Sequence, residues 1–578
     1  MRKWLKCIRM RTESVFAFAT NIETARSGQL PPANPTMSEA DISMPTRTEI
    51  KGFPVAGTPQ STAPRLGAEA LPFPVATTAT AESLLQKVFS FPCMLATFLV
   101  GSVFAVGRAF SVDPDLWWHI KTGQIILNTH HWPTVDAYSF TVAGHPWIAG
   151  EWVGDVLIAT VARQAGLQGL DALLIGLGSA VMVALYGYAA LRSGNSKAGL
   201  VVAAVLLVLA NASFSLRPQM FGYLFLVLTL VALERFRQGE PRGLYVLPVL
   251  FLVWVNTHGS FVIGIGTIAV FLLCGLFEFQ LGGIQASRWT AHQRRQLEIV
   301  LLLSLIALTI TPYGVQLALY PFHVAGSLPI GVANVAEWQS MPFGLFGGKF
   351  FLALVLGFFI CQIAFRTAVR VEELVLLLCG IVMACLHVRF LLVFVPFFVP
   401  GFSTIIARWI PPYERAKDRY LLNGVLMACL VAGMVHYFPA REAIQRKVAS
   451  QFPVEAVEYL QTHQIPGPMF NSYGFGGYLV WADQKVFVDG RADPYERGGS
   501  LADYFYVTQL KPGALAVLRN YGIQSCLLDR DEPLVTLLSA LPEWQRVYSD
   551  NLSVLFVRRN SVTPARAFTG SPMSGQKE

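Results

Sequence analysis

Long apolar runs without charged residues recur between about residues 89 and 438 of this chain. Over the whole sequence, 53% of residues are hydrophobic and 14% are charged, whereas ordinary soluble domains carry about 25% charged residues. A run of about 20 apolar residues is long enough to cross a bilayer as a helix. The sequence therefore predicts an α-helical polytopic membrane protein. The apolar runs are 89–110, 172–191, 198–216, 218–233, 243–277, 299–316, 350–365, 374–388, 390–407 and 420–438.

Basic residues gather in the short links between these runs. Because such links stay on the cytoplasmic side of a membrane, we place them all on that side. Insertion therefore accounts for the net charge of +8, and no nucleic-acid partner is expected. The links carry Arg192 and Lys197; Arg235, Arg237 and Arg242; Arg288, Arg294 and Arg295; Arg366 and Arg370; and Arg408, Arg415, Lys417 and Arg419.

The charge pattern also predicts the number of crossings. The uncharged stretch 243–277 joins two cytoplasmic links, so it must cross an even number of times and form a hairpin. Residues 374–407 form a second hairpin, with Arg389 at its outer end. The result is about eleven spans, with the amino end in the cytoplasm and the carboxyl end outside.

The other segments divide the chain into four predicted parts. Residues 1–87 are rich in Ala, Thr, Pro and Ser and predict a disordered cytoplasmic tail, like the short tail 561–578. Residues 88–439 form the transmembrane part, whose polar loop 111–169 is extracytoplasmic. Residues 440–560 alternate strands and helices, which predicts a small extracytoplasmic α/β domain. Beyond the spans, the expected elements are helices 151–164, 453–463, 501–510, 513–521 and 534–541, strands 478–482, 485–489 and 523–528, and a hairpin over 545–558.

The segment 113–119, Asp-Pro-Asp-Leu-Trp-Trp-His, follows the first span directly. Pro114 ends the helix and holds Asp113 and Asp115 in a turn near the membrane surface. Two carboxylates in such a place could act as a general base or bind a divalent cation. The alternatives are a solvated loop start and, for the two Trp residues, an interfacial anchor. No Cys/His spacing typical of a metal site occurs, so no cofactor is certain and a divalent cation remains possible.

This chain resembles the many-span glycosyltransferases of the GT-C type, in their bacterial branch that uses polyprenyl-phosphate-linked sugars. The resemblance covers about residues 88–560. It implies sugar transfer on the extracytoplasmic face of the bacterial inner membrane, from a lipid-linked donor to a glycan, lipid or protein acceptor. The resemblance rests on 113–119, His145-Pro146-Trp147 through Glu151-Trp152, Arg217-Pro218-Gln219, Trp254 through Gly259, Glu337-Trp338 and 471–491.

The resemblance implies that one of Asp113 and Asp115 is the catalytic carboxylate. We rank Asp113 above Asp115 because it is nearer the end of the first span. The leaving lipid phosphate needs cationic groups at the membrane surface. Arg217 and Arg389 lie at outer hairpin ends between uncharged runs, which favours phosphate binding, although a lone Arg there could also reach to lipid headgroups. The further candidates for substrate binding are His119, Glu151, His258, Glu337, Asp489 and Arg491.

Two of these candidate regions have structural alternatives. Asn256 and His258 could satisfy backbone groups where a hairpin breaks. Asp489 and Arg491 follow the glycine-rich segment 474–477, where close backbone approach is expected. Their alternative is a surface pair on a strand–turn–strand unit. The Trp-Trp-Asp-Tyr-Gly motif of oligosaccharyltransferases is absent, which leaves protein N-glycosylation in doubt.

Two other functions compete with glycosyl transfer. A transporter or flippase of lipid-linked precursors would carry ionisable residues near the middle of its spans. Here the spans are nearly free of charge at their centres, and the ionisable residues gather outside. A non-catalytic membrane scaffold would show no dependence on Asp113 or Asp115.

Overall fold

The computed structural model describes residues 84–107, 112–210, 214–325 and 329–559. The chain divides into two units, residues 1–87 and 88–578, and a short helix, α2 (Leu84–Val88), lies at their boundary. The two predicted disordered tails fall almost wholly outside the described residues. The predicted domain boundary near residue 440 lies inside the second unit and stays a prediction.

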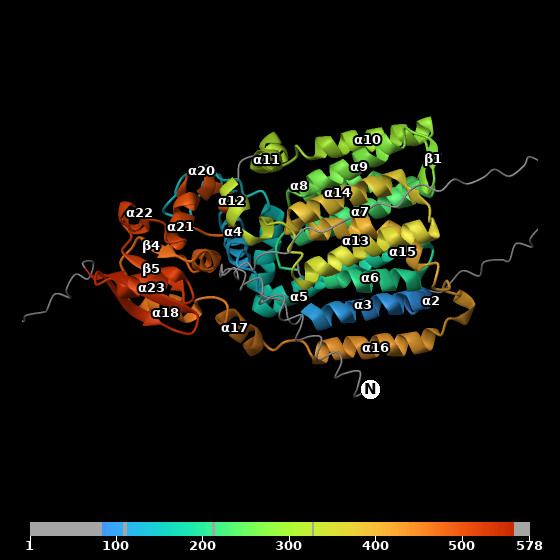
Figure 1. Cartoon of the computed structure of the whole chain (residues 1–578). Coiled ribbons are helices and arrows are strands. Elements are labelled where there is room, and N and C mark those ends of the chain that lie inside the picture. Colours follow the sequence, from blue (N-terminus) through green and yellow to red (C-terminus); the bar gives the residue numbers. More distant parts are fainter. Residues whose placement is uncertain (1–83, 108–111, 211–213, 326–328, 560–578) are drawn as a thin grey trace, which may run out of the picture. The chain divides into compact units, whose positions relative to one another are not determined.

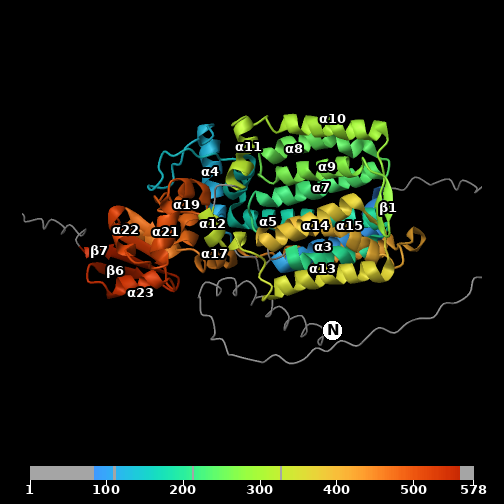
Figure 2. The same cartoon turned by 45° about the horizontal axis from the view of Figure 1, so that its top comes forward.

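Each predicted apolar run contains a helix, because a helix satisfies all of its backbone groups internally. The long helices lie side by side (Figure 1), and the second view agrees (Figure 2). Helix α5 contacts α3, α6, α7 and α15. The apolar helices are α3 (Phe91–Gly107), α5 (Trp152–Ser193), α6 (Ser196–Ala210), α7 (Gln219–Arg237), α8 (Leu247–Val255), α9 (Phe261–Cys274), α10 (Ala291–Ala307), α13 (Phe346–Phe365), α14 (Val371–Leu386), α15 (Leu391–Ile406) and α16 (Tyr420–His436).

Four described helices are long and apolar enough to cross a membrane, namely α5, α7, α13 and the segment Val388–Ile406. A fifth span results if α16 and α17 (Arg441–Ala449), bent by 57° at a short break, are taken together. The outer helices expose large apolar side chains such as Ile363 (78%) and Leu421 (84%), as lipid-facing surfaces do. The protein is therefore a helical membrane protein, and the eleven spans stay a prediction.

Each predicted hairpin contains two helices, and its two membrane crossings stay a prediction. Helices α8 and α9 are separated by a break at residues 256–260. Helices α14 and α15 contact each other and are joined by the 3₁₀ turn η4 (Val388–Phe390), which carries Arg389. The first loop differs from expectation in two ways. Helix α4 (Leu116–Thr129) follows the Asp pair directly, and the predicted helix 151–164 continues into α5 beyond a kink at Gly166.

Several basic links have buried acidic partners that the sequence did not reveal. Arg192 pairs with Glu373 at 2.6 Å, and Arg370 pairs with Glu234. Arg237 pairs with Glu372 and stacks on the Trp289 ring. These pairs tie together the ends of α5, α7 and α14. The short elements between the helices are η2 (Pro241–Val246), β1 (Phe279–Leu281), β2 (Ile284–Ala286), α11 (Val315–Ala325), α12 (Pro329–Asn334), η3 (Ala336–Trp338), β3 (Val369–Arg370) and η5 (Arg415–Lys417).

The carboxyl-terminal region contains a four-stranded sheet in the order β4-β5-β7-β6. Strands β4 and β5 are parallel, and β7 pairs antiparallel with both β5 and β6. The strands are β4 (Met469–Asn471), β5 (Ser525–Asp529), β6 (Trp544–Ser549) and β7 (Ser553–Arg558). The helices are α17, α18 (Val454–Thr462), η6 (Tyr473–Phe475), α19 (Gly476–Trp481), α20 (Ala492–Arg497), α21 (Ser500–Thr508), α22 (Ala514–Asn520) and α23 (Pro533–Ala540).

Most predicted elements of this region are confirmed, but two strands are wrong. The expected strand 478–482 is helix α19, because a short apolar run fits a buried helix as well as a strand. Residues 485–489 form no strand, and Val486 makes an isolated bridge to Ser139 of the first loop. Strand β4, which pairs with β5 on the side opposite β7, was not predicted.

Candidate active site

The predicted acid pair lies in a turn directly before α4. The backbone N–H of Asp115 donates to the Asp113 carboxylate (2.9 Å), so the local turn itself orients the first acid. Both carboxylates meet Arg217, which precedes α7: Nε lies 2.8 Å from Asp113 Oδ2 and Nη2 lies 3.0 Å from Asp115 Oδ2. Of the two Trp residues, Trp117 is not an interfacial anchor, since it is buried against Tyr478 and Phe452.

The same guanidinium reaches a third carboxylate. Arg217 Nη1 lies 3.2 Å from Glu337 Oε2, and the other oxygen of Glu337 lies 3.4 Å from Arg389 Nη1. The Arg389 guanidinium also stacks over the Trp338 ring at 4.1 Å. Three carboxylates and two guanidiniums from separate chain segments thus form one network. We call Asp113, Asp115, Arg217, Glu337 and Arg389 the acid–arginine network.

Glu151, at the start of α5, lies between two histidines. Its carboxylate is 3.7 Å from His119 Nε2 and 3.4 Å from His258 Nε2. Each histidine is oriented from behind, His119 by Asp155 (2.6 Å) and His258 by the Ser260 hydroxyl (2.8 Å). Asp155 was not among the predicted site residues, although its spacing of four from Glu151 places both on one helix face.

Asn256 fulfils the structural alternative, and His258 does so in part, because its Nδ1 accepts from the Ser260 backbone N–H (3.1 Å) while its Nε2 faces Glu151. The Asn256 amide donates to the carbonyls of Leu252 (2.9 Å) and Ile310 (3.1 Å), and its oxygen accepts from Trp152 (2.8 Å). These bonds satisfy backbone groups at the break between α8 and α9.

Burial shifts several of these groups toward neutral forms. Burial raises the pKa of Asp115 to about 6, against the lowering effect of Arg217, and raises the pKa of Glu151 to about 7. Burial lowers the pKa of His258 to about 3, so this imidazole is neutral at physiological pH. Burial alone would raise the pKa of Glu337, but Arg389 and Arg217 outweigh it and lower this pKa. The site therefore holds two carboxyls that titrate near neutral pH, the range useful for proton transfer.

The acid–arginine network does not fit a divalent cation. The Arg217 guanidinium lies between Asp113, Asp115 and Glu337 and already neutralises the oxygens that a cation would bind. Among the described residues, no group of three or more His, Cys, Asp or Glu side chains could hold a metal ion.

Glycines of the carboxyl-terminal region approach the acid pair closely. A Cβ atom on Gly490 would lie 1.6 Å from Asp115 Oδ1, and one on Gly477 would lie 2.2 Å from the Pro114 carbonyl oxygen. The Tyr473 hydroxyl donates to the Gly490 carbonyl at 3.3 Å. The expected close approach is thus confirmed at Gly477, whereas Gly474 has open space beside it. Gly490 belongs to the site and was missed.

Asp489 and Arg491 are not a surface pair. Both side chains are at most 3% exposed, and they bind each other and Asp136 rather than the acid–arginine network. A direct contact with substrate would require them to leave these partners. The other predicted site residues fall into the acid–arginine network or the histidine group around Glu151, which meet at residues 113–119.

No family model matches the sequence, and no curated protein matches it. Similar solved structures include an oligosaccharyltransferase of Archaeoglobus fulgidus tethered with an acceptor peptide (12% identity, TM-score 0.45, 77% of this chain and 70% of that chain covered). ArnT of Cupriavidus metallidurans is another (14% identity, TM-score 0.44, 79% and 97% covered). At these identities and TM-scores the matches do not establish an activity, which must be sought in this chain's own residues.

Proposed function

We propose that this protein is a membrane glycosyltransferase that moves a sugar from a polyprenyl-phosphate-linked donor to an acceptor hydroxyl on a glycan, lipid or protein. The acid–arginine network is the observation that carries the proposal. It brings carboxylates for proton transfer and guanidiniums for an anionic leaving group to one place at the ends of apolar helices. The predicted location is the extracytoplasmic face of the bacterial inner membrane.

The chemistry follows from these groups. The acceptor oxygen attacks the anomeric carbon of the donor sugar and loses its proton to a site carboxylate. The bond from this carbon to the phosphate oxygen breaks, and its electron pair leaves with the lipid phosphate. Of the acid pair, we choose Asp115 as the base, because burial raises its pKa to about 6. Arg217 and Arg389 remain 21% and 23% exposed, so a phosphate could reach them.

An apolar cavity beside the site supports a lipid-linked donor. Its volume is about 580 Å³. Trp152, which follows Glu151, and Asn256, which precedes His258 by two positions, line one part of it, so the cavity adjoins the histidine group. An isoprenoid chain suits such a lining. The lining residues are Trp132, Trp152, Val153, Leu252, Val253, Asn256, Thr309, Ile310, Thr311 and Pro312.

The transporter and scaffold alternatives make different use of charge. A carrier needs ionisable groups along a path through the bilayer. The two networks of ion pairs described above lie instead at helix ends, one at residues 113–119 and one around Glu373. A scaffold gives no reason for two carboxyls to titrate near neutral pH in one place.

The proposal is tested by sugar transfer in proteoliposomes that contain purified protein, a polyprenyl-phosphate-linked sugar and candidate acceptors. The double variant Asp113→Asn, Asp115→Asn should lose transfer, whereas the matched control Asp483→Asn, an exposed acid paired with Lys121, should retain it. Full activity of the double variant would contradict the mechanism and favour the alternatives. Mass spectrometry of lipid-linked sugars in a deletion strain would identify the donor.

A further inference from the structure

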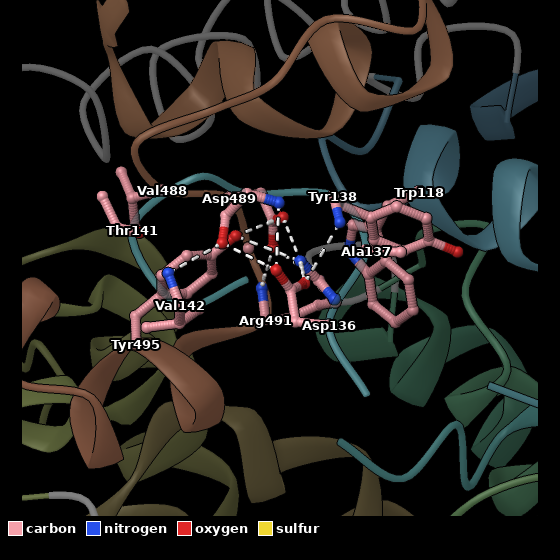
Figure 3. Close-up of polar contacts among 12 residues, drawn as sticks. Trp118, Asp136, Ala137, Tyr138, Thr141, Val142, Val488, Asp489, Arg491 and Tyr495 are labelled. Carbon is pink, nitrogen blue, oxygen red and sulfur yellow. Dashed lines mark hydrogen bonds and ion pairs between the residues drawn. The ribbon is translucent and has the colours of Figure 1, made fainter. Parts of the chain in front are cut away.

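A second charge cluster is buried around Arg491 (Figure 3). Arg491 makes a two-pronged contact with Asp489, through Nε at 2.9 Å and Nη2 at 2.7 Å, and Nη2 also lies 2.7 Å from Asp136. The Tyr495 hydroxyl donates to Asp489 at 2.6 Å. All four side chains are buried. We call Asp136, Asp489, Arg491 and Tyr495 the buried clamp.

The buried clamp joins two distant parts of the sequence. Asp136 belongs to the first loop, while the other members lie at the start of α20 and just before it. The rings of Tyr138 and Trp147, both from the loop, stack on the Arg491 guanidinium at 4.5 and 4.6 Å. A buried charge is tolerated only when its partners are correctly placed, because removing one leaves an uncompensated charge. The clamp therefore specifies one arrangement of the two segments.

The buried clamp acts on the acid pair through Gly490, which lies between Asp489 and Arg491 in the sequence. Gly490 is bonded to Asp489 on one side and to Arg491 on the other, and its Cα faces the Asp115 carboxylate without room for a side chain. The Tyr473 hydroxyl fixes the Gly490 carbonyl from a third direction. Backbone held in this way excludes water from one side of Asp115 and limits the directions in which its carboxylate can point.

We propose that the buried clamp is a positioning device for Asp115, with Arg491 as the positioning residue that holds Gly490 against this carboxylate. The inference rests on the proposed function for its catalytic meaning, but its structural content is independent of it. Opening the clamp admits water to Asp115 and misplaces it relative to the acceptor. A misplacement of about 1 Å costs on the order of 10²-fold in rate.

The principal test compares Arg491→Gln with Arg497→Gln. Arg497 lies at the end of α20, the helix that begins directly after Arg491, and pairs with Asp493 at a half-exposed position. We expect Arg491→Gln to lower kcat by about 10²-fold with little change in the KM for donor. The acidic limb of its rate profile should move to lower pH, because a hydrated Asp115 ionises more readily. Arg491→Lys should recover part of the rate. A wild-type kcat and an unmoved limb in folded Arg491→Gln would overturn the proposal.

Hydrogen exchange keeps the inference testable if a variant loses stability or if no sugar transfer is found. Folded Arg491→Gln, but not Arg497→Gln, should exchange the amides of residues 113–119 faster than the wild type. Gly490→Ala leaves the clamp side chains in place and crowds Asp115 directly, so it should lower kcat as Arg491→Gln does. Unchanged exchange at residues 113–119 would overturn the clamp whatever the activity. Absence of transfer by the wild type, with faster exchange in Arg491→Gln, would overturn only the proposed function.

Discussion

At the scale of single residues, the surroundings of each carboxyl determine its pKa. Asp115 and Glu151 titrate near neutral pH because burial opposes their charge, whereas the two arginines beside Glu337 keep that carboxyl ionised. The sequence identified these candidates through their position after hydrophobic runs. The ranking of Asp113 above Asp115 rested on nearness to the first span alone, because the partners of these acids come from other helices and the burial of each depends on the assembled fold. Asp136, Asp155 and Gly490 were missed for the same reason.

Replacing the acids by isosteric amides should separate their roles. If Asp115 is the base, Asp115→Asn should lose about 10²–10⁴-fold in turnover, the usual effect of a positioned proton acceptor. Donor binding should survive. Because a base works only when ionised, the wild-type rate should fall as pH drops through about 6 to 7, where Asp115 and Glu151 become protonated. Rates across pH 5–8 for Asp113→Asn, Asp115→Asn and Glu151→Gln measure this, and an unchanged acidic limb in all three would contradict it.

Arg217 should not tolerate a change to lysine. The lysine keeps the charge but loses the fork that contacts Asp113, Asp115 and Glu337. Hydrogen bonds to charged groups contribute about 1.5–3 kcal/mol each, so Arg217→Lys should weaken donor binding and slow transfer by roughly tenfold or more. Steady-state kinetics against the exposed control Arg163→Lys measures the effect. Equal constants for the two variants would exclude Arg217 from the site.

Chelation should leave the activity intact, because Arg217 already supplies positive charge between three carboxylates. Removing that guanidinium in Arg217→Gln should expose an oxygen ligand set suited to a divalent cation. Electron paramagnetic resonance with Mn²⁺ should then detect binding to this variant and not to the wild type. Adding Asp113→Asn should abolish the binding. Loss of wild-type activity in chelator, restored by Mg²⁺ or Mn²⁺, would contradict the expectation.

At the scale of elements, the positions of the charged residues were a better guide to the helices than short apolar runs were to helices or strands. Each stretch predicted as a hairpin contains two helices, as expected from an apolar stretch too long for one span between two basic links. The run 478–482 failed because five apolar residues carry too little periodicity to separate a strand from α19. Helix α4 was missed because Pro114 indicates the end of one helix and equally permits the start of the next.

Filling the apolar cavity should affect donors according to chain length. Val253 of α8 lines the cavity, whereas Val249, one turn earlier on the same helix, does not. Val253→Trp should raise the KM for a long polyprenyl donor more than for a short isoprenyl one, and Val249→Trp should change neither. Transfer assays with donors of two lengths decide this. An equal effect on both lengths would place the isoprenoid chain elsewhere.

At the scale of the whole molecule, the ion pairs agree with the predicted sidedness. Asp113, Arg217, Glu337 and Arg389, all predicted outside, belong to one network, and Arg192, Arg237 and Arg370, all predicted inside, pair with acids at other helix ends. The sequence could predict this grouping because insertion rules act on each link separately. It could not predict the acidic partners, which lie within the apolar helices α7 and α14.

Reporter fusions should test the topology directly. Fusions after Lys197, Arg242, Arg295 and Arg415 should report the cytoplasm, because basic links remain on that side. Fusions near Thr141 and after Arg559 should report the outside. A cytoplasmic signal after Arg559 would contradict the model of eleven spans and would conflict with the contact between Asp136 and Arg491.

The buried clamp has a consequence for biogenesis. Asp136 emerges from the ribosome early and Arg491 late, after every apolar helix has been made. Because synthesis proceeds from the amino end, the half of the clamp on the first loop must wait for its counterpart until the segment that contains Arg491 has been made. A partly translated chain therefore has the acid pair without the Gly490 backbone that shields Asp115. The site is assembled only when this segment has been made. A chain that ends before residue 490 therefore lacks both the backbone that contacts Asp115 and the arginine that holds it, and we expect such a chain to be inactive.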